Sequence, residues 1–285
     1  MKLAFRFFIR VGRTVTLLVL VAVGSAALVR FAPGYLSDAR EMDARYSAGA
    51  RSDLSAEAAR SKSLATILSN ETMGWLDGSL GISRQYEVPV VELIRPRLAV
   101  TAGLLGRAIL SAWLLSLAFS LLSSSGRTPS FLWQVPSALI LALPTAAMAT
   151  ICLLTDRGGP LLVMTLLIGA RDFKFLDRIL RKTWREPYVL QARAQGIGLF
   201  RLLHGHILPS IGSELLALCT LSIITALGAL VPIEVIFNIP GLGGLAWTAA
   251  LNRDLPVLLA ISMMMALAVT GAGALSSRPA EAGTA

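Results

Sequence analysis

Three small residues near the C-terminus have the spacing of a dinucleotide-binding turn. Gly241, Gly243 and Ala246 stand as G-x-G-x-x-A within VIFNIPGLGGLAW, after a β-branched run. In a parallel α/β fold such glycines let the backbone approach a pyrophosphate at a helix N-terminus, and an acid about 20 positions further on binds the ribose. Here the next acid is Asp254, thirteen positions after Gly241, and no other segment offers companion strands. We therefore exclude a nucleotide cofactor at this stretch.

The same stretch is better interpreted as a turn between two membrane spans. Pro240 and Gly241 predict a sharp turn, and Gly243 and Gly244 permit close packing as a short helix over about 245–252 folds back toward a pore mouth.

Other residue types that do chemistry are sparse. His204 and His206 are two positions apart, so they point to different faces of a helix and make a poor metal pair. Cys152 and Cys219 both lie in apolar runs, as ordinary packing residues do. The chain has no G-x-x-x-x-G-K-[ST] phosphate loop, so it cannot supply an ATPase site. None of these residues forms a catalytic set.

The composition identifies the elements that must position these residues as membrane helices. The 285 residues are 55% hydrophobic and 15% charged, against about 25% charged in soluble domains. Apolar runs long enough to cross a bilayer predict an all-α integral membrane protein with six spans. These cover residues 7–31, 98–122, 131–154, 160–170, 211–231 and 256–275. The fourth run is short, so its helix either continues with Arg171 and Lys174 reaching the interface, or is packed inside protein.

The positions of Lys and Arg predict the orientation. Basic residues cluster before the first span, near Arg127, in the segment 171–201 and at Arg278. Six crossings put all four regions on one side, which the positive-inside rule makes cytoplasmic together with both termini. The net charge of +9 thus reflects cytoplasmic loops rather than nucleic-acid binding.

The predicted domains follow from this topology. Residues 1–31 form an N-terminal anchor, 32–97 an extracytoplasmic insertion, 98–275 the main transmembrane domain and 276–285 a cytoplasmic tail. A basic start before an apolar stretch with GSAA at 24–27 also fits a cleavable signal peptide, but the later spans favour an uncleaved anchor.

The cytoplasmic segment between the fourth and fifth spans has a distinctive pattern. Glu186 and Pro187 predict the start of a helix, and Ala192, Ala194 and Gly196 follow as small residues that let another surface approach. Spacing alone leaves two interpretations, a docking surface or a surface helix with accidental alanines.

Several motifs resemble the binding-protein-dependent ABC importer permeases, closest to the peptide/nickel (dipeptide, oligopeptide) subgroup. EPYVLQARAQG followed by HILP is similar to their cytoplasmic coupling loop, here residues 181–209. WLDGSLGIS at 75–83, PVVELIRPRLAVT at 89–101 and VIFNIPGLGGLAWTAALNRDLPVL at 235–258 resemble further family segments in the same order. The chain departs from the pattern at Ser79, where the family usually has Asp, and in the short TDRGG connection.

The resemblance implies a pore-forming permease subunit of the bacterial inner membrane that imports peptides or a related small solute. Its implied partners are a second permease subunit (a paralogue or a second copy), two cytoplasmic ABC ATPase subunits, a periplasmic solute-binding protein and membrane lipid. ATP and Mg²⁺ would bind the ATPase subunits, so this chain has no cofactor of its own. A coupling helix over about 189–200 would transmit the ATPase motion, and Gly196 would permit close approach and a turn.

The resemblance also assigns candidate residues. Those for ATPase coupling are Tyr188, Ala192, Arg193, Ala194, Gly196, His206, Leu208 and Pro209. Those for the pore or gate are Arg107, Glu234, Pro240, Gly241, Gly243, Gly244 and Asp254.

Three of the pore or gate candidates are charged, and for two of them the sequence leaves two interpretations open. Arg107 lies near mid-depth of the second span and either faces the pore or pairs with another group such as Glu214. Glu234 and Asp254 fall in the predicted extracytoplasmic loop, where Glu234 either faces the pore mouth or is solvated.

Two other function classes compete with the permease. A membrane scaffold or regulator that kept the fold without transporting is one. An intramembrane enzyme is weaker, because both histidines fall in the basic cytoplasmic segment.

Overall fold

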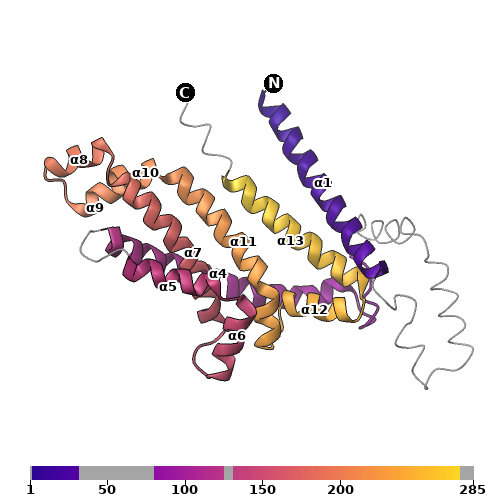
Figure 1. The fold of residues 1–285 in the computed structure, drawn as a ribbon. Helices are drawn as coiled ribbons and strands as arrows, with labels where there is room; N and C mark the ends of the chain where they lie inside the picture. The colour runs from indigo at the N-terminus through magenta and orange to yellow at the C-terminus, as the bar shows by residue number, and fades with distance from the viewer. Residues whose placement is uncertain (1, 32–79, 125–130, 277–285) are drawn as a thin grey trace, which may run out of the picture. The chain divides into compact units, whose positions relative to one another are not determined.

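Helices account for nearly all of the chain that the computed structural model describes, residues 2–31, 80–124 and 131–276. A single β-bridge, between Ile82 and Pro89, is the extended pairing found within those ranges. The all-α prediction is therefore confirmed. In chain order (Figure 1) the elements are α1 (Lys2–Phe31), α4 (Val90–Ser124), α5 (Phe131–Ala142), α6 (Thr145–Leu154), α7 (Pro160–Thr183), α8 (Pro187–Ala194), α9 (Leu199–Leu202), a π-helical turn (Leu203–Ile207), α10 (Leu208–Ser210), α11 (Gly212–Ile236), α12 (Leu242–Leu251) and α13 (Leu255–Ser276).

Three of the described helices, α4, α11 and α13, are long and apolar enough to cross a membrane. The pair α5 and α6 makes a fourth if it is one span, although its two halves are bent by 96°. Helix α1 is apolar over Gly12–Ser25, and α7 carries charges from Arg171 onward. The structure thus supports three or four spans by length and composition, and six crossings stays a prediction.

Helix boundaries differ from the predicted spans at three places. The third span is not one helix, because the chain breaks before Pro144, which lacks an N–H and disfavours helical backbone in the preceding residue. The second begins at Val90 rather than 98, with Pro96 inside the helix. The fifth continues past Pro232 to Ile236 instead of ending at 231.

The fourth predicted span is the first part of one continuous helix, which extends beyond the apolar run. Helix α7 runs for 24 residues from Pro160 to Thr183, about 36 Å at 1.5 Å per residue. It packs against α5, α6 and α11 (Figure 1), so much of its charged half lies within protein.

Two compact units divide the chain, residues 1–99 with 240–268 and residues 100–239 with 269–285. The core of the first is built by the start of α4, α12 and α13 around Ile94, Leu245 and Ile261. The core of the second joins α4, α6, α7 and α11 around Leu104, Met148, Ile168 and Ile233.

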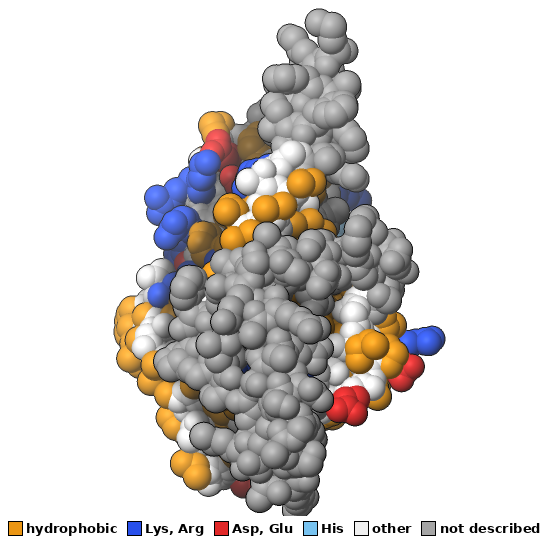
Figure 2. All heavy atoms as spheres, turned by 90° about the vertical axis from the view of Figure 1, so that its right-hand side faces the viewer, with side chains coloured by type: hydrophobic (Ala, Val, Ile, Leu, Met, Phe, Trp, Pro, Cys, Tyr) orange, Lys and Arg blue, Asp and Glu red, His pale blue; other side chains and the backbone are white. Residues whose placement is uncertain are grey.

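Large apolar side chains also lie on the outside of the helices. Leu110 and Leu114 on α4 and Leu139 on α5 are each 63% exposed. On the face shown in Figure 2 the described side chains are mainly hydrophobic, and most of the visible Lys and Arg gather in its upper left part. Such apolar surfaces are expected where lipid or another subunit replaces water.

Candidate functional site

The predicted coupling segment forms a small folded unit between α7 and α11. Helix α8, the short helix α9, the π-helical turn and α10 follow one another and pack on their own apolar cluster. Val189, Ala192, Leu202 and Ile207 are buried in this cluster, together with Leu180 from the end of α7. This small core fixes the segment to the end of α7.

The predicted coupling helix over about 189–200 is divided in this structure, because the chain turns between α8, which ends at Ala194, and α9, which begins at Leu199. Gly196 has φ +77° and opens onto empty space, while the Ile197 N–H donates to the Ala192 carbonyl at 3.2 Å. This bond, from two residues past the helix end back to its last turn, is a Schellman cap with glycine in the left-handed position. Gly196 therefore supplies the predicted turn.

The small residues of the motif face different ways. Ala192 is 4% exposed and packs into the segment's own core, whereas Ala194 is exposed. Two positions on a helix lie about 200° apart, so they cannot share a face. The backbone of Arg193 belongs to α8, and its side chain lies outside the described residues.

A side-chain hydrogen bond joins the beginning of the segment, in α8, to its end, in α10. The Tyr188 hydroxyl lies 2.8 Å from the Ser210 Oγ, and Ser210 donates in turn to the Ile207 carbonyl at 2.8 Å. The remaining coupling candidates, His206, Leu208 and Pro209, lie between Tyr188 and Ser210 in the sequence and are exposed.

Within the described ranges no group of three His, Cys, Asp or Glu is placed to hold a metal.

In the other unit, Asp254 joins two of the sequence motifs. It is fully buried just before α13, and its carboxylate accepts hydrogen bonds from the Ser83 hydroxyl and from the backbone N–H groups of Arg84 and Gln85, the latter two at 3.2 Å. Ser83 ends the motif WLDGSLGIS, whose first five residues, including Ser79, lie outside the described residues. Asp254 is thus a buried structural acceptor that holds the loop before α4.

The structure places Glu234 in a helix, whereas the sequence predicted it in an extracytoplasmic loop. It lies inside α11, is fully buried, and accepts a hydrogen bond of 2.7 Å from the Thr101 hydroxyl on α4. The predicted solvated environment is wrong because α11 continues through Pro232.

The turn in VIFNIPGLGGLAW falls two residues earlier than predicted. Asn238 takes the left-handed conformation at φ +51°, and the Ile239 N–H donates to the Glu234 carbonyl at 2.8 Å, a second Schellman cap. Gly241 is extended and precedes α12. The helical run before the turn confirms that no dinucleotide-binding strand precedes these glycines.

Helix α12 confirms the predicted short helix and begins three residues earlier than expected, at Leu242. Gly241 and Gly243 are buried, Gly244 is half-buried and Pro240 is exposed. The apolar face of α12 packs on the start of α4 and on α13 within the same unit.

Arg107 is exposed on α4, and its Nε donates to the Gly103 carbonyl one turn earlier at 2.9 Å. Glu214, also among the described residues, does not pair with it. The predicted structural pairing with Glu214 is therefore not formed in this chain.

A buried polar cluster was missed by sequence reasoning. Asp172 on α7 is fully buried, and its Oδ2 accepts from Ser222 on α11 at 2.7 Å, while the Trp113 indole on α4 donates to the Ser222 Oγ at 3.1 Å. The other carboxylate oxygen of Asp172 has no hydrogen-bond partner. Asp172, Trp113 and Ser222 lie on three different helices. A polar or charged residue within such a helix is a sequence feature that could have indicated this contact, because polar groups in membrane helices usually pair with one another.

Comparison with known proteins decides the family. Residues 115–278, more than half of the chain, match the family described as binding-protein-dependent transport system inner membrane component. The chain belongs to this family. It is therefore a membrane component of such a transport system and not an enzyme, and the resemblance found in the sequence is confirmed.

Individual relatives are moderately similar to this permease component. A probable peptide ABC transporter permease from Sinorhizobium fredii is 29% identical over 109 residues, 37% of this chain and 35% of the relative. A metal-staphylopine import system permease from Staphylococcus aureus is 33% identical over 108 residues, 38% of this chain and 34% of the relative. An oligopeptide transport system permease from Bacillus subtilis is 28% identical over 210 residues, 64% of this chain and 66% of the relative. The chain thus spans about a third of the length of the first two relatives and 66% of the length of the third.

Proposed function

We propose that this permease component forms the pore of an ATP-driven importer together with a second permease subunit, and that it carries peptides or a related small solute delivered by a periplasmic binding protein. The printed names of its relatives, which concern peptide, oligopeptide and metal-staphylopine transport, support this class of solute.

The observation that carries the proposal is the folded segment between α7 and α11. Its core, its Tyr188–Ser210 closure and the cap at Gly196 give it a fixed shape at the end of α7. A fixed shape can transmit a rigid-body movement, whereas a loose loop would absorb it. We propose that its exposed residues, among them Ala194 and His206, dock on an ABC ATPase subunit, and that Ala192 supports them from inside.

The proposed topology has six crossings and both termini in the cytoplasm. Helices α1 and α7 would add two crossings to the four that length and composition support. The charged half of α7 is compatible with this role because Asp172 is hydrogen-bonded within protein and Asp177 forms an ion pair with Arg181 at 2.9 Å.

A pair of glycine variants tests the coupling role. Gly196→Val places a β-branched residue at φ +77°, which disfavours the cap. Gly198→Val is the matched control, since its added side chain also meets open space and its backbone φ is outside the left-handed range. The complex that co-purifies in mild detergent is reconstituted, and the ATPase activity stimulated by the binding protein is measured.

We expect Gly196→Val to lower stimulated ATPase activity and solute uptake at least about tenfold and Gly198→Val to leave both near wild type. Unchanged coupling in Gly196→Val would remove the coupling role from this segment. If the reconstituted wild-type complex takes up no solute, the alternative of a non-transporting membrane scaffold would be favoured instead.

A further inference from the structure

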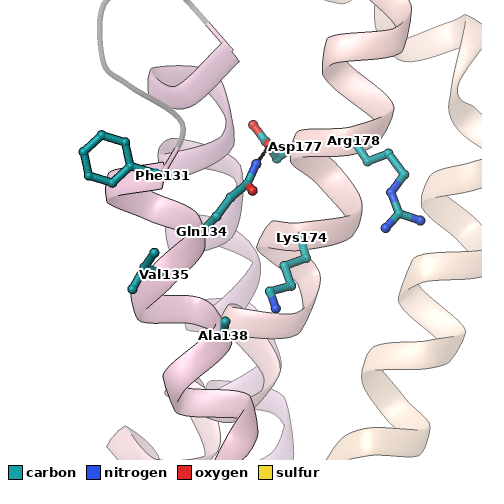
Figure 3. A pocket seen from close by; sticks show the side chains of 7 residues that line it. All are labelled: Phe131, Gln134, Val135, Ala138, Lys174, Asp177 and Arg178. Atoms are coloured by element: carbon teal, nitrogen blue, oxygen red, sulfur yellow. Dashed lines mark hydrogen bonds between the residues drawn. The ribbon is translucent and has the colours of Figure 1, made fainter.

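A pocket lies between α5 and α7, with apolar side chains on α5 and charged side chains on α7 (Figure 3). Its volume is about 470 Å³. Phe131, Val135 and Ala138 line it from α5, and Lys174 and Arg178 line it from α7. In Figure 3 the Arg178 side chain extends from the side of α7 that faces away from α5. Arg178 also lines a second hollow of about 480 Å³ with Lys182 and Arg185, so the two adjoin along α7.

The cations form a row along one face of α7. Lys174, Arg178 and Lys182 follow one another at intervals of four residues, which places them on the same side of the helix. Like charges at this spacing repel one another and destabilise a helix. A bound anion would convert this repulsion into attraction.

The acid in the pocket does not neutralise this row. Asp177 is only 6% exposed, and both of its oxygens accept from Arg181 Nε at 2.9 Å. Arg181 is further occupied by Ser123, to whose carbonyl and hydroxyl it donates. Gln134 completes the surroundings of Asp177 across the gap at 3.5 Å (Figure 3). In the second hollow, Glu186 is the acid that faces the remaining cations.

The apolar wall continues onto the outer face of α5. Phe131, Val135 and Leu139 are 61%, 52% and 63% exposed. The Arg178 guanidinium lies over the Phe175 ring, 5.9 Å from its centroid, which orients this charge beside apolar surface. Apolar surface next to a row of cations matches a ligand with an acyl chain and an anionic head, and basic pockets between membrane helices bind such headgroups.

We infer that Lys174, Arg178 and Lys182, with the exposed face of α5, bind an anionic phospholipid of the surrounding membrane. Its phosphate accepts a charge-assisted hydrogen bond from the Lys174 ammonium, Arg178 and Lys182 add positive charge along the same helix, and an acyl chain lies on Phe131, Val135 and Leu139. The inference goes beyond the proposed transport function, since it requires only that the chain is embedded in a membrane.

Native mass spectrometry of the full chain tests the inference. The chain is purified in the presence of equal amounts of phosphatidylglycerol and phosphatidylethanolamine, and the retained lipid is identified. The test variant is Lys174→Gln/Arg178→Gln. The control is Arg95→Gln/Arg157→Gln, which removes the same charge from exposed positions outside the pocket. A second variant, Val135→Ser/Leu139→Ser, alters only the apolar wall.

We expect wild type and control to retain phosphatidylglycerol over phosphatidylethanolamine, and both test variants to lose that retention about tenfold. All variants should show the wild-type melting temperature in phosphatidylethanolamine alone, which separates binding from folding. Millimolar inorganic phosphate should not displace the lipid.

Three results would overturn the inference. Equal retention in Lys174→Gln/Arg178→Gln and in the control would remove the lipid site. Displacement by inorganic phosphate would indicate a site for free phosphate. Unchanged lipid retention combined with loss of co-purifying subunits in the test variant would assign the cationic row to a protein partner.

Discussion

Asp172 on α7 and Ser222 on α11 form a buried polar contact between the two helices. Ser222 is the partner of one carboxylate oxygen and also accepts from the Trp113 indole, while the second oxygen already lacks a partner. A buried polar group without a partner costs about 1–3 kcal/mol, and more if it is charged. A single hydroxyl therefore satisfies a buried carboxylate and a half-buried indole.

Removing that hydroxyl is expected to destabilise the protein strongly. Ser222→Ala leaves both the Asp172 carboxyl and the Trp113 indole unsatisfied, so we expect a loss of about 2–5 kcal/mol in the free energy of unfolding. Thr225→Val on the same helix is the control, because the Thr225 hydroxyl donates only to the Leu221 carbonyl of its own helix. Reversible unfolding in detergent measures both.

A double-mutant cycle shows whether the two side chains act together. Asp172→Ala/Ser222→Ala should cost less than the sum of the single changes, since either single change already removes the shared hydrogen bond. Strict additivity would mean that the hydrogen bond contributes nothing to stability.

The individual site residues were predictable only where sequence spacing determines geometry. Gly196 follows a short helix and its left-handed turn was expected from residue type. The contact between Ser83 and Asp254 was not, because 171 positions separate the two residues and no local pattern relates them. Glu234 was misplaced for a related reason, since only packing decides whether a helix continues past a proline.

At the scale of elements, the ends of helices depend on single left-handed residues. Asn238 closes α11 at φ +51° and Arg253 closes α12 at φ +55°. In both places the N–H of the next residue donates to a carbonyl in the helix's last turn, at 2.8 Å. The cap at Arg253 sets the direction in which α13 leaves α12.

The cap of α11 predicts opposite effects for two substitutions of Asn238. Asn238→Gly should be neutral or stabilising, because glycine adopts this conformation without strain. Asn238→Val should cost about 1–2 kcal/mol, since a β-branched residue disfavours positive φ. Thermal unfolding of both variants provides the measurement, with Asn252→Val as control at φ −91°. Equal melting temperatures for the glycine and valine variants would contradict this account.

Long apolar runs were sufficient to predict α4, α11 and α13 but not the bend between α5 and α6. Pro136 and Pro144 both lie in the same apolar run, yet α5 continues through the first and ends before the second. The sequence does not distinguish them locally. Packing of α5 on α7, and of α6 on both α7 and α11, determines which break occurs.

For the molecule as a whole, the crossing of α7 decides the topology. If α7 crosses the membrane, the α6–α7 connection and the coupling segment lie on opposite sides, and both termini are cytoplasmic. If it does not, they share a side and the termini are separated. Its first half is apolar and its second half carries Arg171, Lys174 and Arg178, so composition alone cannot decide.

Site-directed labelling distinguishes the two topologies. In a background of Cys152→Ala/Cys219→Ala, which removes the two half-buried free thiols, Arg157→Cys and Gln195→Cys each place one thiol at an exposed position on either side of α7. We expect a membrane-impermeant maleimide to label Arg157→Cys in intact spheroplasts and Gln195→Cys only after permeabilisation. Labelling of both before permeabilisation, or of neither, would show that α7 does not cross. In that case the segment 187–210 and the α6–α7 connection would face the same compartment, and the six-crossing arrangement would be replaced by five.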